Sequence, residues 1–169
     1  MNNYHIDGVS GSGKTTICKE LKRRGYQTID ADEELAYFGN PKTGEPDEKT
    51  ERKDFAKNWI WDKEKTLLEL NKKSDNPTFF CGGTMNLEHF AEYFKKTFIL
   101  HIDDETLKHR LANRTNNDFG KHPDELAMQL EWNAKAYKNA EEKGAIIINA
   151  TRPVNEVVDE ILHNTNDEQ

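Results

Sequence analysis

One stretch of ten residues, "DGVSGSGKTT" from Asp7 to Thr16, constrains the fold more than any other part of the chain. From Gly8 to Thr15 it fits the phosphate-binding pattern G-x-x-x-x-G-K-[ST], between a short apolar run and an amphipathic stretch that stops at Gly25. In this pattern the glycines let backbone N–H groups converge on phosphate oxygens, while the lysine offsets phosphate charge and the hydroxyl binds Mg²⁺. The sequence therefore predicts a strand, a phosphate-binding loop and a helix whose N-terminus points at a nucleotide. The residues expected to hold that nucleotide are Gly8, Gly11, Ser12, Gly13, Lys14, Thr15 and Thr16.

Apolar runs and amphipathic stretches alternate along the rest of the chain. The short apolar runs predict strands at 3–7, 26–32, 78–81, 97–102 and 145–150. One-sided apolar spacing predicts helices over 87–94, after an N-cap at Asn86, over 126–137 and over 154–161. The buried face of the second helix is expected to consist of Leu126, Leu130, Asn133, Ala134 and Tyr137. This alternation is typical of an α/β fold of three layers, α/β/α, with a five-stranded parallel sheet. With 169 residues the chain suits one domain, expected over 1–165, with a polar tail at 166–169.

Composition excludes several classes of protein. A formal net charge of −7 argues against the binding of bulk nucleic acid, which requires a basic surface. The chain lacks a stretch of about 18 apolar residues, and its first residues lack the features of a secretory signal, so we expect a cytoplasmic protein without a membrane span. Cys18 and Cys81 are too few and too far apart to indicate a disulfide framework or a zinc site. The oligomeric state is left open.

Two polar segments rich in turn-forming residues interrupt the alternation. Residues 38–50, "FGNPKTGEPDEKT", combine proline, glycine and charge, and residues 114–122, "RTNNDFGKH", separate two expected helices. Long loops of this kind in compact domains are usually functional or disordered. We expect both segments to be mobile flaps.

Two acids follow the second expected strand in the stretch "IDADEE". On a strand, Asp30 and Asp32 would project from the same face, and the carboxyl ends of parallel strands form the ligand crevice. Together with the phosphate-binding loop, this stretch resembles the D-x-D of shikimate and gluconate kinases, which belong to the nucleotide-kinase and shikimate-kinase-like group of P-loop NTPases. The resemblance implies that Asp30 binds Mg²⁺ together with Thr15, and that Asp32 orients or deprotonates the acceptor hydroxyl. A solvated strand end is the alternative interpretation.

The chain has only six arginines, and two of them, Arg110 and Arg114, lie four residues apart on one face of an expected helix. That helix leads into residues 114–122, so the pair resembles the R-x-x-x-R entry to the short LID of nucleotide and shikimate kinases. The resemblance implies that both arginines close over the triphosphate and stabilise charge during transfer, with Lys121 as a third cation. Two solvated arginines on a helix surface would be the alternative.

After the fifth expected strand, "NATRPVNEVVDEI" resembles the turn that wraps the adenine base in nucleotide kinases. The resemblance implies that Arg152 and Pro153 bind ATP by flanking the base, and an arginine can stack on a purine. Capping of the last helix by the same residues is the competing interpretation.

The half of the chain expected to bind the phosphoryl acceptor, about 33–75, holds a single arginine. Arg52 suits a carboxylate or phosphate on the acceptor. Gly82 and Gly83, in "FFCGGTMN", are similar to the glycine-rich strand end of shikimate kinases and would let the backbone approach the acceptor, although an ordinary turn explains them as well. Trp59 and Trp61 are expected on one helix, where residues two apart cannot both face the core. We expect Trp59 to pack and Trp61 either to pack or to stack on an acceptor ring.

The resemblance extends over residues 3 to 162. It implies an ATP- and Mg²⁺-dependent phosphotransferase acting on a small acceptor of the nucleoside, nucleotide or hydroxy-acid type. Lys14, Asp32, Arg110 and Arg114 would be its catalytic residues. A nucleoside-triphosphate hydrolase, a non-catalytic nucleotide-binding module and a polynucleotide kinase are the alternatives.

The chain also departs from the patterns of several P-loop families. It lacks the D-G-[FY]-P-R signature of adenylate kinases, and its LID is short, which argues against a nucleoside monophosphate as acceptor. The nearest candidates for a Walker B carboxylate, Asp103 and Asp104, are expected to cap a helix instead. This argues against an oligomeric ATPase of the AAA type.

Overall fold

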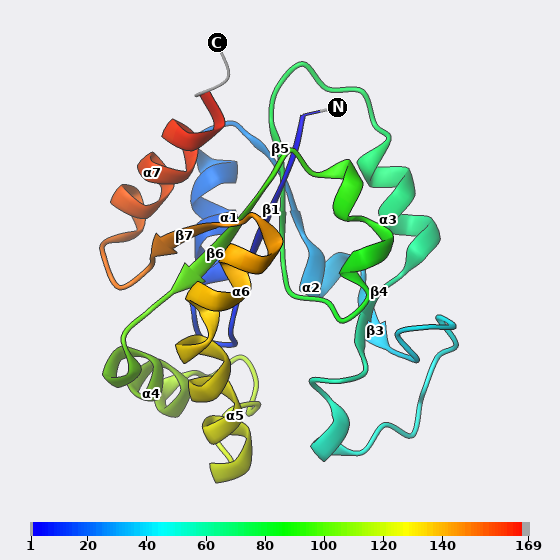
Figure 1. Cartoon of the computed structure of the whole chain (residues 1–169), viewed down its shortest axis with the longest axis vertical. Coiled ribbons are helices and arrows are strands. Elements are labelled where there is room, and N and C mark those ends of the chain that lie inside the picture. The colour runs from blue at the N-terminus through cyan, green and yellow to red at the C-terminus, as the bar shows by residue number, and fades with distance from the viewer. Residues whose placement is uncertain (1, 167–169) are drawn as a thin grey trace.

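The computed structural model describes residues 2–166, so residues 167–169 of the predicted tail lie outside the described part. Its main sheet has five strands: β1 (Asn3–Gly8), β2 (Gln27–Asp30), β5 (Thr78–Cys81), β6 (Lys96–His101) and β7 (Ile146–Asn149). Every neighbouring pair is parallel, and the spatial order is β2-β5-β1-β6-β7 (Figure 1). The predicted α/β fold with a five-stranded parallel sheet is therefore confirmed.

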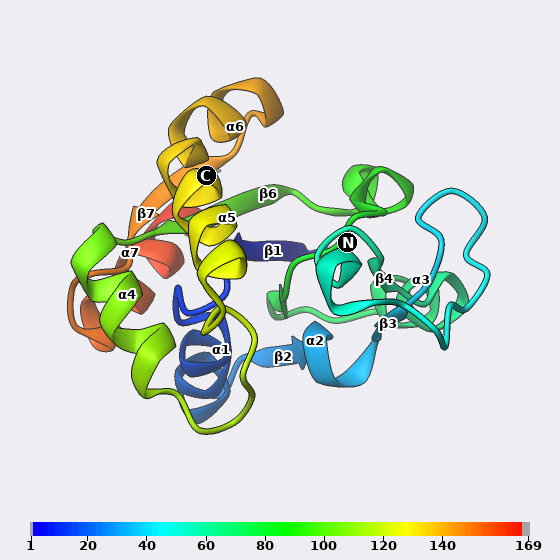
Figure 2. The ribbon, with the colours of Figure 1, turned by 90° about the horizontal axis from the view of Figure 1, so that it is seen from below.

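Alternate residues of the strands face opposite layers of helices. Ile6 and Phe98 lie in the core beneath α1 (Lys14–Arg23) and α7 (Val154–Asn166), whereas Ile99 packs with α6 (Ala136–Lys143). Figure 2 shows α1 and α7 on one side of the sheet and α6 on the other. A strand that is covered on both faces needs apolar residues at successive positions, which explains the short apolar runs in the sequence.

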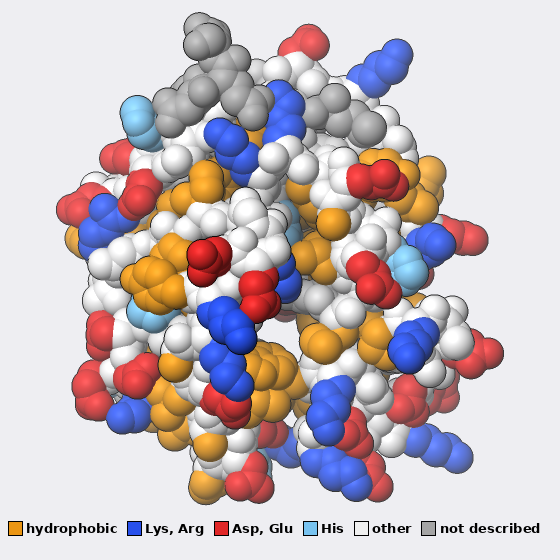
Figure 3. Space-filling model, viewed as in Figure 1, with side chains coloured by type: hydrophobic (Ala, Val, Ile, Leu, Met, Phe, Trp, Pro, Cys, Tyr) orange, Lys and Arg blue, Asp and Glu red, His pale blue; other side chains and the backbone are white. Residues whose placement is uncertain are grey.

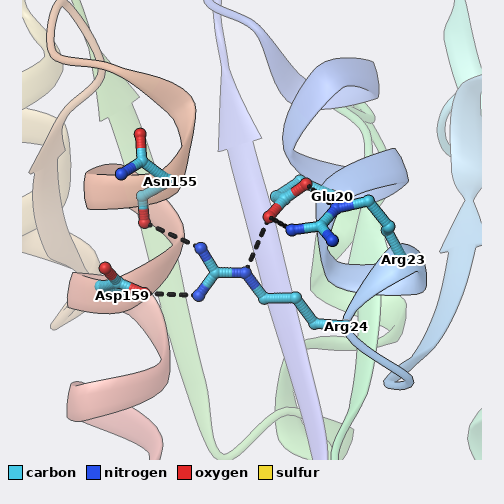
Figure 4. Close-up of polar contacts among 5 residues, drawn as sticks. All are labelled: Glu20, Arg23, Arg24, Asn155 and Asp159. Atoms are coloured by element: carbon cyan, nitrogen blue, oxygen red, sulfur yellow. Dashed lines mark hydrogen bonds and ion pairs between the residues drawn. The ribbon is translucent and has the colours of Figure 1, made fainter.

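A charged network ties the end of α1 to α7 (Figure 4). Arg24 donates to Glu20 of its own helix at 2.8 Å, to the backbone oxygen of Asn155 at 3.1 Å and to the carboxylate of Asp159. Arg23 makes two further hydrogen bonds of 2.7 Å to Glu20. Hydrogen bonds from Arg23 and Arg24 lower the pKa of Glu20 to about 2, so this carboxylate stays ionised near neutral pH.

A small antiparallel pair of strands, β3 (Ala36–Phe38) and β4 (Trp59–Trp61), lies beside the main sheet. The expectation that Trp59 and Trp61 lie on a helix is wrong, because α3 (Lys63–Leu70) begins only after β4. Asp62 is the N-cap of α3 and accepts a 2.9 Å hydrogen bond from the Lys65 N–H. The structure buries Trp61 fully, so this residue packs. Trp59, the residue expected to pack, is partly exposed.

The connection between β3 and β4, residues 39–58, contains the predicted polar loop. An antiparallel bridge between Gly39 and Pro46 closes its first half. Its second half contains a short 3₁₀ turn, η1 (Arg52–Asp54). We refer to residues 39–58 as the β3–β4 connection.

Two predicted elements end or divide earlier than expected. The strand predicted at 26–32 stops at Asp30, because α2 (Ala31–Glu34) begins there. Asp32 therefore lies on α2, and the shared strand face proposed for Asp30 and Asp32 is wrong.

The helix predicted at 126–137 is two helices, α5 (Pro123–Ala134) and α6, separated at Lys135.

The helix predicted at 87–94 is replaced by two 3₁₀ turns, η2 (Leu87–His89) and η3 (Ala91–Tyr93). Asn86 does not cap a helix, because its side chain bonds the backbone of Trp61 in both directions. Its Nδ2 donates to the Trp61 oxygen at 2.9 Å, and its Oδ1 accepts from the Trp61 N–H at 3.0 Å. Among the helices of residues 2–166, none is long and apolar enough to cross a bilayer.

Candidate functional site

A cavity of about 410 Å³ opens at the carboxyl ends of the strands. A separate hollow is visible in the space-filling view between the part formed by α5 and the part formed by β3, β4 and their connection, none of which lines this cavity (Figure 3). The cavity brings together most of the predicted site residues from distant parts of the sequence. Its predicted lining residues are Gly11, Ser12, Gly13, Lys14, Thr15, Thr16, Asp32, Arg110, Arg114 and Arg152. Further lining residues are Ser10, Ile17, Glu33, Asn116, Asn117, Ala150, Val154 and Val157.

The P-loop forms the floor of this cavity. Gly13 is the N-cap of α1 in the left-handed conformation, with φ of 107°, and it supplies no side-chain cap. The first N–H groups of α1 are therefore available to an anion, and the helix dipole favours one there. Lys14 Nζ donates to the backbone oxygens of Gly8 at 2.7 Å and Val9 at 3.3 Å, which holds the ammonium group over the loop. Ser12 Oγ is buried without a hydrogen-bond partner.

The two predicted LID arginines reach the P-loop from the end of α4 (Asp104–Asn113). Asp103 caps this helix through a 2.8 Å hydrogen bond from the Thr106 N–H, as expected from the sequence. Arg110 Nη1 donates to the Ser12 oxygen at 3.2 Å. Arg114, which directly follows the helix, donates to Ser10 Oγ at 2.6 Å. Burial lowers the pKa of Arg114, but a guanidinium remains charged in proteins, so both cations face the cradle.

Asp32 lines the cavity and is held by Trp59, which the sequence analysis expects to pack. Trp59 Nε1 donates to Asp32 Oδ1 at 3.0 Å from the strand β4. Phe38 lies edge-on to the Trp59 ring at 5.0 Å between centroids and stacks on Phe55 at 4.6 Å. The alternating stretch "WIW" is the sequence signal for this strand, because β-branched and aromatic residues at alternate positions favour strands.

Gly82 and Gly83 make room for carboxylates. A Cβ on Gly82 would lie 3.0 Å from Asp32 Oδ1, and a Cβ on Gly83 would lie 3.0 Å from Asp7 Oδ1. Neither glycine lines the cavity, so their predicted contact with an acceptor stays a prediction. Asp7 accepts a 2.7 Å hydrogen bond from the N–H of Gly8, and the sequence analysis assigns it no role.

Asp30 lies behind Asp32 and does not line the cavity. Its Oδ1 is buried without a hydrogen-bond partner. Burial raises the pKa of Asp30, and the charges of Asp32 and Glu33 raise it further. An unpartnered buried carboxylate oxygen is available to a cation.

Arg52 forms an ion pair with Glu125. Its Nε donates to Glu125 Oε1 at 2.6 Å, and its Nη2 donates to Glu125 Oε2 at 3.1 Å and to the Asp118 oxygen at 3.0 Å. It does not line the cavity, so its role at the acceptor stays a prediction. Lys121 pairs with Asp118 at 3.0 Å and does not line the cavity either.

Arg152 lines the cavity together with Ala150, Val154 and Val157. Its Nε donates to the Asn149 oxygen at 3.2 Å, and its guanidinium pairs with Glu160 of α7. Pro153 directly precedes α7 and does not line the cavity, although Val154 does. Both of the interpretations that the sequence allows for Arg152, contact with a base and support of the last helix, fit this position.

Residues 5–131, more than half of the chain, match the family model described as "AAA domain". The chain belongs to this family. Among solved structures, shikimate kinase from Aquifex aeolicus vf5 is similar to this AAA-domain protein over 98% of the chain and 96% of its own, with 23% identity and a TM-score of 0.57. A gluconokinase from Sinorhizobium meliloti 1021 is similar over 98% and 92%, with 19% identity and a TM-score of 0.58. Deoxyadenosine kinase from M.mycoides, solved with bound dATP, is similar over 98% and 100%, with 18% identity and a TM-score of 0.61.

These likenesses establish the fold of the AAA-domain protein as that of the kinase-like P-loop NTPases. The resemblance drawn from the P-loop, the D-x-D stretch and the arginine pair is therefore confirmed at the level of the family. No curated protein sequence matches the chain.

The residues of this AAA-domain protein fit a nucleotide-bound Mg²⁺. The described residues contain no group of three or more His, Cys, Asp or Glu side chains placed to hold a metal ion. Mg²⁺ in nucleotide sites does not need such a group, because phosphates and water supply most of its ligands beside one or two carboxylates. Thr15 lines the cavity and offers one such donor, whereas Asp30 does not line it, so its predicted contact with Mg²⁺ stays a prediction.

Proposed function

We propose that this protein is an ATP- and Mg²⁺-dependent kinase that transfers a phosphoryl group to a small-molecule acceptor. One observation carries the proposal. A single cavity of about 410 Å³ is lined by a phosphate cradle, by Arg110 and Arg114, and by Asp32. A nucleotide-binding protein without transfer activity would need the cradle but not the carboxylate.

The donor side supplies charge and position. The N-terminus of α1 and Lys14 bind the β- and γ-phosphates, with the residues from Gly8 to Thr16 as the cradle and Arg152 and Pro153 beside the base. Arg110 and Arg114 stabilise the charge that spreads over the transferred group. Mg²⁺, held by Thr15 and Asp30, would offset charge on the phosphates when it is bound.

On the side of the phosphoryl acceptor, the carboxylate of Asp32 is held in a fixed orientation and can accept a hydrogen bond. Because the indole N–H of Trp59 binds Oδ1 of Asp32, the second carboxylate oxygen is left to receive the acceptor hydroxyl. The similar structures are a shikimate kinase, a gluconokinase and a deoxyadenosine kinase, whose acceptors are a hydroxy acid, a sugar acid and a nucleoside. We therefore propose an acceptor of the nucleoside, nucleotide or hydroxy-acid type, near Asp32, Gly82 and Gly83. Arg52 can bind an anionic acceptor only by releasing Glu125. The cytoplasmic location also stays a prediction.

Incubation with ATP, Mg²⁺ and a panel of nucleosides, nucleotides, sugar acids and hydroxy acids tests the proposal. Phosphorus NMR is expected to show one phosphorylated acceptor, and Asp32→Asn is expected to lower its kcat by about 10²-fold, as loss of a positioned acid or base does. Lys14→Ala is expected to abolish transfer, whereas Lys19→Ala on the exposed face of α1 is the matched control. Turnover of ATP to ADP and phosphate that no acceptor changes, and that Asp32→Asn leaves intact, would instead identify a hydrolase.

A further inference from the structure

Three polar residues are the most buried residues of α5: Glu125, Gln129 and Asn133. The predicted face is confirmed at Leu126 and Leu130, which pack partly buried against the core, and at Asn133, but it is wrong at Ala134 and Tyr137, which are exposed. The three polar residues follow one another at intervals of four residues, so they share one face of the helix. Their exposures are 6%, 1% and 1%, and buried polar groups of this kind are retained when they are hydrogen-bonded.

Each of the three side chains holds a different segment. Asn133 Nδ2 donates to the Ile102 oxygen at 2.6 Å, directly after β6. Gln129 Oε1 accepts the N–H of Ser10 in the P-loop at 2.7 Å. Glu125 accepts the N–H of Gly120 in the LID at 2.8 Å. One helix face therefore fixes the end of β6, the P-loop and the LID relative to one another.

Glu125 also connects to the β3–β4 connection. Arg52 approaches its carboxylate with two parallel hydrogen bonds, a geometry that adds both strength and direction to an ion pair. The Arg52 guanidinium further donates to the Asp118 oxygen in the LID. Figure 1 shows α5 and the teal segment that carries Arg52 facing each other at the same end of the molecule. Arg52 is the residue through which the two flaps meet.

We propose that Glu125 is a positioning residue and that its ion pair with Arg52 is a clasp joining the β3–β4 connection to the LID. The inference rests on the proposed function, because it gives the two flaps a common movement around donor and acceptor. Arg114 donates to Ser10 Oγ and to the Phe119 oxygen, so the clasp acts on the same loop that holds the catalytic cation. Closure over the acceptor and closure over the triphosphate then occur as one event.

The charge state of Glu125 agrees with this role. Burial alone would raise the pKa of Glu125, but the hydrogen bonds from Arg52 and from the Gly120 N–H lower it below its usual value. The carboxylate therefore stays ionised at neutral pH and keeps both partners.

Amide hydrogen exchange of the free protein tests the clasp without any acceptor. Glu125→Gln keeps an acceptor for the Gly120 N–H but removes the ion pair, and Arg52→Gln removes it from the exposed side. Both variants are expected to speed exchange about tenfold in residues 39–58 and 114–122 together. Glu131→Gln, which breaks the exposed pair with Lys135 on the same helix, is the matched control. Faster exchange in only one of these two segments, in either variant, would overturn the clasp.

Kinetics with the identified acceptor separate the clasp from a direct role of Arg52 in acceptor binding. The clasp predicts that Glu125→Gln and Arg52→Gln each raise the KM values of both ATP and acceptor. If Arg52 served the acceptor alone, Glu125→Gln would free it and lower the acceptor KM. That result would reject the proposal. Failure of the wild type to phosphorylate any acceptor would reject the proposed function, while the exchange experiment would still decide on the clasp.

Discussion

The donor half and the acceptor half of the cavity are built in different ways. The donor half uses ends of regular elements: the N-terminus of α1 and the last turn of α4 bring Lys14, Arg110 and Arg114 to one place. The proposed acceptor half reaches the cavity only through Asp32 and Glu33, and behind Asp32 it consists of an antiparallel pair of short strands, an irregular connection and hydrogen bonds such as that between Trp59 and Asp32. Binding of a phosphate can therefore be encoded in a short motif, whereas recognition of an acceptor is distributed over tertiary contacts.

The largest effect is expected from the arginines of the donor half. Removal of a positioned cation weakens stabilisation of the transition state more than binding of the ground state. Arg110→Ala and Arg114→Ala are each expected to lower kcat by about 10²-fold with a smaller change in the KM for ATP. Steady-state kinetics measure both constants, and Arg23→Ala on the exposed side of α1 provides a control arginine.

A rise in the KM for ATP at unchanged kcat would mean that these arginines only bind the nucleotide. Lys14 would then be the remaining candidate for a catalytic cation in the donor half. Both halves would serve mainly to bind their ligands, and the difference between them would be smaller.

A smaller effect is expected in the acceptor half from Trp59→Phe. Phenylalanine keeps the aromatic contact with Phe38 but removes the N–H that orients Asp32. We expect kcat to fall about tenfold, which corresponds to about 1.4 kcal/mol in the activation barrier. Kinetics at saturating ATP measure this loss, with Trp132→Phe on α5 as control. An unchanged kcat would show that Asp32 needs no support from β4.

The smallest effect concerns pH and again belongs to the acceptor half. His5 of β1 is fully buried against Phe94 and Trp61, and its Nε2 lies 2.9 Å from the Gly82 oxygen. Burial lowers the pKa of His5 below its ordinary value of 6.5. Below that pH the unfolded chain takes up a proton that the folded protein does not, so the free energy of unfolding falls as the pH falls.

For a single proton the slope from His5 is at most about 1.4 kcal/mol per pH unit, and its sign is a loss of stability as the pH falls below 6.5. Denaturant unfolding between pH 5.5 and 6.5 measures it. His5→Phe should flatten this slope, whereas His109→Gln on the exposed face of α4 should leave it. Equal slopes in the wild type and His5→Phe would assign the pH dependence to other groups.

The sequence predicts the donor half and the sheet well, because both depend on local patterns. Buried strands require short apolar runs, and the cradle requires a fixed spacing of glycines, lysine and hydroxyls. The acceptor half was less predictable for physical reasons. The helical turn after Asp30 and the pairing of β3 with β4 depend on contacts between segments that lie far apart in the sequence. Likewise, Glu125 and Gln129 resemble exposed polar residues until their partners are known, whereas Asn133 lies on the face that the sequence predicts to be buried.

Gln129 has a consequence for the thermodynamics of nucleotide binding. Its amide oxygen binds the N–H of Ser10, while Arg114 binds the hydroxyl of the same residue. These contacts hold the P-loop at Ser10 through protein atoms alone, so the loop backbone is restrained before any nucleotide binds. A preorganised loop loses little conformational entropy on binding, and more of the interaction with the phosphates is then retained as affinity. The α5 helix thus acts as a rigid template for a loop whose glycines would otherwise allow many shapes.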